Sequence, residues 1–147
     1  MGFTVIRPEE LDWDTRPHEP EEAARHVAEL SDLAGFAHTR GNVWRYEPGA
    51  KGRRHRHKTQ EETFVVLSGT LSMYAGDPPE RVDVPAGGLV HVQPGTPLQS
   101  VNYGDQELVL YGTARRPRVS EPSFWIPRSS RPAARRSTMR SRSDRGA

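Results

Sequence analysis

The amino-acid sequence predicts an all-β fold, a sandwich or barrel of short strands. After Gly41, short runs rich in β-branched and aromatic residues recur between turn signals made of Gly, Pro, Asn, Asp and Ser. No segment with helical length and spacing separates these runs, so a parallel sheet with crossover helices is not favoured. The expected strands cover residues 42–46, 55–57, 63–67, 70–74, 81–84, 89–93, 99–102 and 107–111.

Residues 1–35 are expected to form an N-terminal extension that packs on this barrel, which itself spans residues 36–126. Residues 3–6 could form a short strand. From Pro20, early acids and apolar residues at helical spacing predict a short helix that stops near Gly35. An edge strand over residues 25–30 is the alternative. His26 is interpreted as a polar surface residue.

Residues 127–147 carry most of the positive charge. They hold seven arginines and one acid, a net charge of +6, while the whole chain carries +2, which leaves −4 for residues 1–126. Ser, Arg, Pro and Ala dominate this tail, and such a composition predicts disorder. Binding of nucleic acid or anionic lipid by the tail is a weaker alternative. The apolar cluster at residues 124–126 could fold back onto the barrel or onto a partner subunit.

The composition limits the chemistry that the protein can perform. The chain has no cysteine, so disulfides, zinc–thiolate sites and thiol nucleophiles are excluded, and any metal must take nitrogen and oxygen ligands. The first residues, MGFTVIRPEELDWD, have neither a basic start nor a sustained apolar run. We therefore expect no signal peptide or membrane anchor, and a cytoplasmic protein.

Two histidines and a glutamate form the strongest chemical pattern. His55 and His57 are two residues apart, so in an extended strand both imidazoles point to the same face. A neighbouring strand that starts at Glu62 could add an oxygen ligand. The alternative is a solvated basic loop, because Lys and Arg residues surround both histidines. We favour the metal site.

The spacing of these residues resembles a known family. Gly49, His55, His57, Glu62 and Gly69 are arranged as in the first motif of the cupin superfamily. The stretch GGLVHVQPGTPLQSVN, residues 87–102, resembles the second motif, with Gln93 in place of the usual proline. The resemblance implies a double-stranded β-helix, or jelly-roll barrel, which is often dimeric. It also implies a metal held by two histidines and a glutamate of the first motif and a histidine of the second.

By this resemblance His55, His57 and Glu62 are metal ligands, but the fourth position is Leu98, which cannot coordinate. Three interpretations follow. The first is a three-ligand site open to water or substrate, which suits Fe, Mn, Ni, Co or Zn as a divalent ion. The second is a cupin that has lost its metal. The third, the least favoured, is a substitute ligand, for which the candidates are His91, Gln93 and Gln99.

A small anionic ligand is expected in the barrel. Arg53 and Lys58 could flank the ligands at its mouth, with Arg56 pointing away, and cations there favour a carboxylate or a phosphate. Trp44 and Tyr46 are candidate pocket walls beside Leu98. The leading hypothesis is a metal-binding, homodimeric cupin. If it is an enzyme, we expect a dioxygenase, an isomerase or a lyase. The alternative is a non-catalytic ligand-binding or sensor module.

Overall fold

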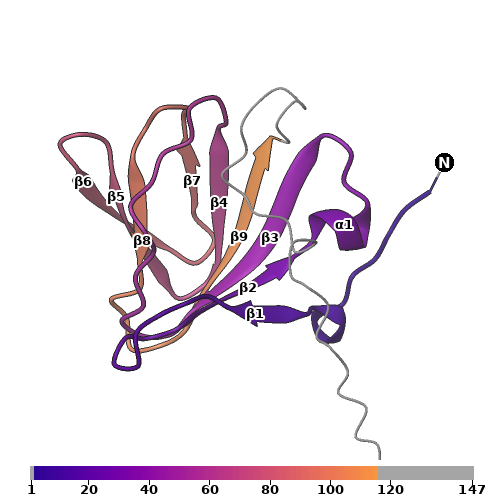
Figure 1. The fold of residues 1–147 in the computed structure, drawn as a ribbon, viewed down its shortest axis with the longest axis horizontal. Helices are drawn as coiled ribbons and strands as arrows, with labels where there is room; N and C mark the ends of the chain where they lie inside the picture. Colours follow the sequence, from indigo (N-terminus) through magenta and orange to yellow (C-terminus); the bar gives the residue numbers. More distant parts are fainter. Residues whose placement is uncertain (1, 116–147) are drawn as a thin grey trace, which may run out of the picture.

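The computed structural model describes residues 2–115, which form a jelly roll of two facing antiparallel sheets (Figure 1). One sheet has six strands in the order β1-β2-β3-β9-β4-β7, and the other has three in the order β6-β5-β8. The strands are β1 (Trp13–Thr15), β2 (Arg25–Glu29), β3 (Thr39–Tyr46), β4 (Glu62–Ser68), β5 (Thr70–Ala75), β6 (Glu80–Pro85), β7 (Leu89–Val92), β8 (Leu98–Val101) and β9 (Leu108–Arg115). The all-β jelly-roll prediction is confirmed.

Seven of the eight strands expected from the sequence are present, each within a few residues of its predicted limits. The exception is 55–57, which is no regular strand. His55 instead forms an isolated antiparallel bridge with Leu98, through backbone hydrogen bonds of 3.0 and 2.8 Å. The predicted apolar cluster at residues 124–126 and the basic tail lie outside the described residues.

The helix expected after Pro20 is wrong. The alternative strand is present as β2, although it lies between β1 and β3 and not at the edge of the sheet. Apolar spacing alone did not decide between them, because β2 pairs with a neighbour on each side and tertiary pairing overrides a weak helix propensity. A short helix, α1 (Ser31–Ala34), follows, and it ends at Gly35 in the left-handed conformation, φ 71°. A 3-10 turn, η1 (Pro8–Glu10), precedes β1. No strand forms over residues 3–6.

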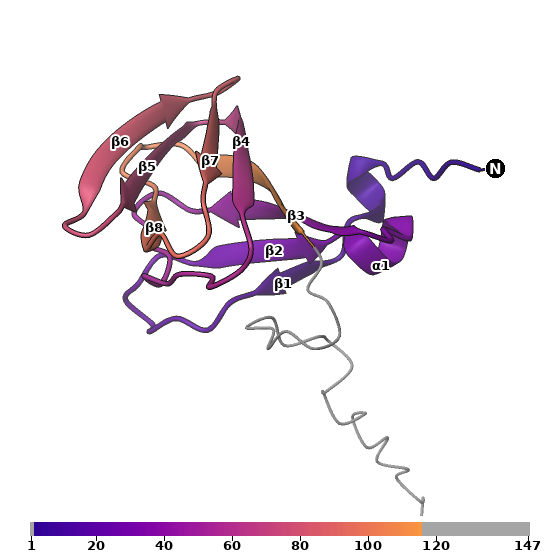
Figure 2. The same cartoon turned by 90° about the horizontal axis from the view of Figure 1, so that it is seen from above.

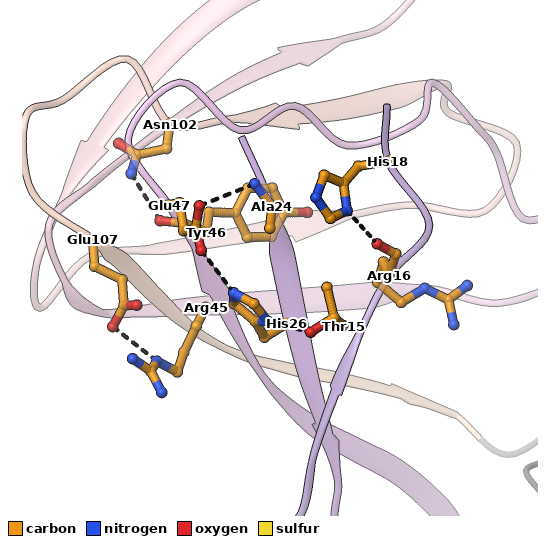
Figure 3. Close-up of polar contacts among 10 residues, drawn as sticks. All are labelled: Thr15, Arg16, His18, Ala24, His26, Arg45, Tyr46, Glu47, Asn102 and Glu107. Carbon is orange, nitrogen blue, oxygen red and sulfur yellow. Dashed lines mark hydrogen bonds and ion pairs between the residues drawn. The ribbon is translucent and has the colours of Figure 1, made fainter. Parts of the chain in front are cut away.

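The N-terminal strands are attached to β3, and Figure 2 shows β1 and β2 continuing the large sheet beside it. A chain of polar contacts, drawn in Figure 3, fastens them on the outer face. The Thr15 hydroxyl lies 2.9 Å from His26 Nδ1, and His26 Nε2 lies 3.0 Å from Glu47 Oε1. The amide of Ala24 donates to Glu47 Oε2 at 3.2 Å. His26 is thus a structural polar residue.

Two residues of the resembled motifs have structural roles. Gly69 sits in the turn between β4 and β5 at φ 77°, where a Cβ atom would lie 2.8 Å from the Glu107 carbonyl oxygen, so only glycine fits. Asn102 is fully buried and donates from Nδ2 to the carbonyls of Tyr46 (2.9 Å) and Gln106 (2.8 Å). Its side chain joins the end of β3 to the turn before β9.

The hydrophobic core lies between the two sheets, and its side chains fill one part of the barrel interior. The strands alternate inward and outward, so each contributes every second side chain to this interior. Its buried apolar members include Phe64, Val66, Leu71, Met73, Val92, Leu98, Leu108 and Leu110. The rest of the interior is an open cavity. Within the described residues, no helix has the length and apolar character needed to cross a membrane.

Candidate metal centre

His55, His57 and Glu62 meet in the cavity between the sheets. Each offers one ligand atom, and these three atoms lie within 4.8 Å of one another. His57 Nε2 is 3.3 Å from Glu62 Oε1, and His55 Nε2 is 3.8 Å from Glu62 Oε2. Glu62 is the first residue of β4, as the sequence suggested. The structure therefore brings together the three residues predicted as ligands.

The backbone orients both imidazoles without a regular strand. The bridge to β8 holds His55, and the amide of Gly95 donates to the His57 carbonyl at 2.6 Å. The two rings lie 5.2 Å apart at 83° to each other. His55 Nδ1 is 2.9 Å from the Arg53 carbonyl oxygen, and because a carbonyl only accepts, Nδ1 carries the proton. When the ring is neutral, its Nε2 lone pair points toward Glu62, as a metal ligand requires.

Glu62 is a buried carboxylate with an unsatisfied oxygen. Its side chain is only 8% exposed, and within residues 2–115 its Oε2 has no hydrogen-bond partner. Burial raises its pKa, but hydrogen bonding and the charges of the two histidines outweigh burial and lower it to about 2. The same carboxylate raises the pKa of His55, against the opposing effect of burial. A bare carboxylate here is stabilised only by positive charge, which a proton on imidazole or a metal ion can supply.

The donor set fits a divalent transition ion. Nitrogen and oxygen donors bound to one such ion at about 2.0–2.2 Å lie roughly 3–3.5 Å from one another. The contact of His57 Nε2 with Glu62 Oε1, 3.3 Å, falls in that range, and the contact of His55 Nε2 with Oε2, 3.8 Å, is slightly longer. An ion would also satisfy the unpartnered Oε2 of Glu62. Two imidazoles and one carboxylate leave further coordination positions open.

Leu98 occupies the position opposite the histidines. It is the Cα partner of His55 in the bridge, and directly opposed residues of an antiparallel pair have their side chains on the same face, with Cβ atoms about 4.5–5.5 Å apart. Leu98 is 1% exposed and lines the same cavity. The chain thus has an apolar side chain at the point where a fourth ligand would stand.

The candidate substitute ligands lie elsewhere. His91 is on the outer face, where Nδ1 contacts the Thr63 hydroxyl at 2.8 Å and Nε2 lies 3.3 Å from Glu61. Gln99 donates to the Gly52 carbonyl at 2.9 Å and belongs to a different hollow beside β5. Gln93 is exposed and does not line the cavity. The structure does not bring any of these three to the cluster.

The cavity beside the cluster has a volume of about 520 Å³. It is lined by all four residues predicted as pocket candidates, Trp44, Tyr46, Arg53 and Leu98. Arg56 also lines it, although the sequence alternation suggested that it points away, because residues 53–58 do not form a regular strand. Lys58 does not line it. The mouth is therefore basic, with a partly different set of residues.

Sequence reasoning missed four further arginines in the cavity: Arg16, Arg25, Arg40 and Arg54. Two of them belong to the N-terminal extension, which could not be placed against the site before its strands were known. Arg40 had a detectable signal, because it continues the two-residue alternation of Trp44 and Tyr46 along β3. Its strand neighbour on β9 is Ala114, which in turn pairs with Glu62 on β4.

Fold and site together define a double-stranded β-helix with a candidate metal cluster inside it. The sequence matches the family described as "Cupin domain" over residues 42–113. The chain therefore belongs to the cupin superfamily, as the two motifs predicted.

Solved structures support the same fold. A sugar phosphate isomerase of the cupin superfamily from Silicibacter pomeroyi is 21% identical, with 78% of this chain and 76% of that chain covered and a TM-score of 0.67. A "predicted oxalate decarboxylase" from Thermotoga maritima is 16% identical, with coverage of 76% and 98% and a TM-score of 0.66. KdgF from Halomonas sp. is 16% identical, with coverage of 79% and 96% and a TM-score of 0.61. No curated protein sequence matches the chain.

Proposed function

We propose that this cupin binds one divalent transition ion through His55, His57 and Glu62 and acts on a small anionic substrate in the adjoining cavity. The observation that carries the proposal is the buried carboxylate of Glu62, whose Oε2 has no hydrogen-bond partner among the described residues and whose two oxygens each face an imidazole nitrogen. Fe, Mn, Ni, Co and Zn all suit this donor set. Similarity to an isomerase and to a predicted decarboxylase supports small-molecule chemistry.

The chain's own residues would perform three tasks. Glu62 supplies the negative charge that offsets an ion, and His55 and His57 complete the set, with His55 oriented by the Arg53 carbonyl. The arginines of the cavity attract and orient an anion by charge-assisted hydrogen bonds. Trp44 and Tyr46 form an apolar wall that keeps water from one side of the substrate. A bound ion would supply Lewis acidity or activation of oxygen.

A direct experiment compares metal-loaded with chelator-treated protein on a panel of small phosphorylated and carboxylated sugars and acids. We expect turnover of at least one anionic compound by the loaded wild type, and none by the Glu62→Gln variant or by the metal-free protein. Turnover that is unchanged after the metal has been removed would refute a metal-dependent reaction.

A second candidate function is a non-catalytic ligand-binding or sensor cupin. Leu98 favours it, because an apolar residue at the fourth ligand position lowers the number of donors to three. In that case an anionic ligand would bind equally well with and without metal, and no compound of the panel would be converted. A homodimer in the cytoplasm stays a prediction, which sedimentation of the purified protein and cell fractionation would test.

A further inference from the structure

Two arginines from the N-terminal extension lie side by side in the cavity. Arg16 continues the β1–β2 pairing, since its amide donates to the Arg25 carbonyl at 2.8 Å next to the register pair Thr15 and His26. Directly opposed residues of two antiparallel strands share a face. Both arginines line the cavity. Two guanidinium groups placed this way repel each other, and an anion between them would offset that repulsion.

Arg25 is held in a fixed position by aromatic rings. Its guanidinium carbon lies 5.9 Å from the Trp44 ring centre and 5.7 Å from the Tyr46 ring centre (distances typical of cation–π contacts). The rings themselves meet edge to face at 6.1 Å. Tyr46 is buried, and Arg25 is the register partner of Tyr46 across β2 and β3. A guanidinium positioned in advance loses little freedom when it binds a planar or tetrahedral anion.

This arginine pair adjoins the candidate metal centre. Arg16, Arg25, His55, His57 and Glu62 all line one continuous cavity. A molecule in the cavity could therefore contact the metal ligands at one end and the arginine pair at the other.

We infer that Arg25 and Arg16 form an anion-binding subsite that selects substrates with a carboxylate or phosphate group in addition to the group that faces the metal centre. The N-terminal extension, which precedes the matched cupin domain at residues 42–113, is then a specificity element. This inference rests on the proposed function for the position of the reacting group. Anion binding by the arginine pair does not itself require a metal.

The test uses the full chain after treatment with a chelator, so that anion binding is measured separately from metal binding. Titration calorimetry at low salt measures the affinity for inorganic phosphate and for malonate in wild type, Arg25→Gln and Arg16→Gln. We expect binding to weaken about tenfold in Arg25→Gln, and less in Arg16→Gln, whose arginine is more exposed. Tighter wild-type binding of phosphate indicates a phosphorylated substrate, and tighter binding of malonate a carboxylated one.

Arg45→Gln is the matched control. Arg45 is on β3 of the same sheet, but its side chain is on the outer face, where Nε donates to Glu107 at 2.9 Å (Figure 3). Its guanidinium also lies over the Trp13 ring, 5.1 Å from the ring centre. The substitution Arg45→Gln removes one positive charge from the protein without altering the cavity, so the anion affinity of this variant should equal that of wild type. Equal affinities in all four proteins, or no binding of either anion to wild type, would overturn the inference. If wild type binds no metal but binds anions in a way that depends on Arg25 and Arg16, only the metal centre would be refuted.

Discussion

The substitution Leu98→His tests the geometry of the metal centre, because it would place an imidazole opposite His55. The bridge between residues 55 and 98 sets their Cβ atoms about 4.5–5.5 Å apart on the same face. A histidine at 98 therefore lies within reach of an ion held by the existing cluster. We expect the affinity for Ni²⁺ or Zn²⁺ to increase about tenfold, which corresponds to about 1.4 kcal/mol.

The same substitution has a cost that can be measured without metal. Leu98 is 1% exposed, and the loss of its buried apolar side chain should lower the free energy of unfolding by about 1.5–3 kcal/mol. Metal should then stabilise the variant more than it stabilises wild type, by about 1.4 kcal/mol at equal excess. For a domain of this size the additional rise in Tm is about 4–7 °C.

The assay is metal titration by calorimetry together with thermal denaturation with and without the ion. Leu98→Ile is the control, because it perturbs the same packing without adding a nitrogen, and it should leave metal affinity unchanged. A folded Leu98→His protein with wild-type metal affinity would refute the placement of residue 98 opposite the ligands.

Three other substitutions test separate parts of the structure. Glu62→Gln keeps the side-chain shape but removes the charge. We expect the metal affinity, measured by calorimetry, to fall by more than the roughly 10–100-fold that is typical when a residue hydrogen-bonded to a metal ligand is lost. A smaller effect would rule out Glu62 as a ligand. Asn102→Asp removes the two side-chain donor bonds to the carbonyls of Tyr46 and Gln106, the first of them buried, and should lower the urea-unfolding free energy by about 2–3 kcal/mol. Unchanged stability would contradict the role of Asn102. His26 and then the Ala24 amide lower the pKa of Glu47 below its ordinary 4.5, so this carboxylate stabilises the fold above pH 4.5, and the stabilisation is lost as pH falls through the folded pKa. Glu47→Gln should therefore cost about 0.2–1 kcal/mol at neutral pH, and the gap to wild type should close in acid; a gap independent of pH would contradict the assignment.

The sequence predicted the fold and the meeting of His55, His57 and Glu62 because both depend on local patterns. Strand alternation and turn glycines such as Gly69 are local, and they located most of the barrel strands. The motif from Gly49 to Gly69 placed two histidines and a glutamate at the spacing that a strand start at Glu62 requires. Even so, the predicted strand at 55–57 proved to be a single bridge, because only His55 pairs with β8 there.

The remaining features depend on contacts between distant parts of the chain. The segment after Pro20 has apolar spacing that suits a helix, and only its pairing with β1 and β3 makes it a strand. Arg16 and Arg25 enter the cavity for the same reason, so no local pattern could assign them to the site. His91 alternates with apolar residues, yet its strand turns that side chain outward toward Thr63.

The central claim is that the cluster of His55, His57 and Glu62 holds one transition metal ion per chain. Elemental analysis of purified protein, before and after reconstitution with Fe, Mn, Ni, Co and Zn, tests it most directly. We predict about one equivalent of one of these ions in wild type and loss of that metal in His57→Ala, with Arg45→Gln retaining it. Wild type that retains no transition metal even after reconstitution, or His57→Ala that retains as much as wild type, would contradict the account.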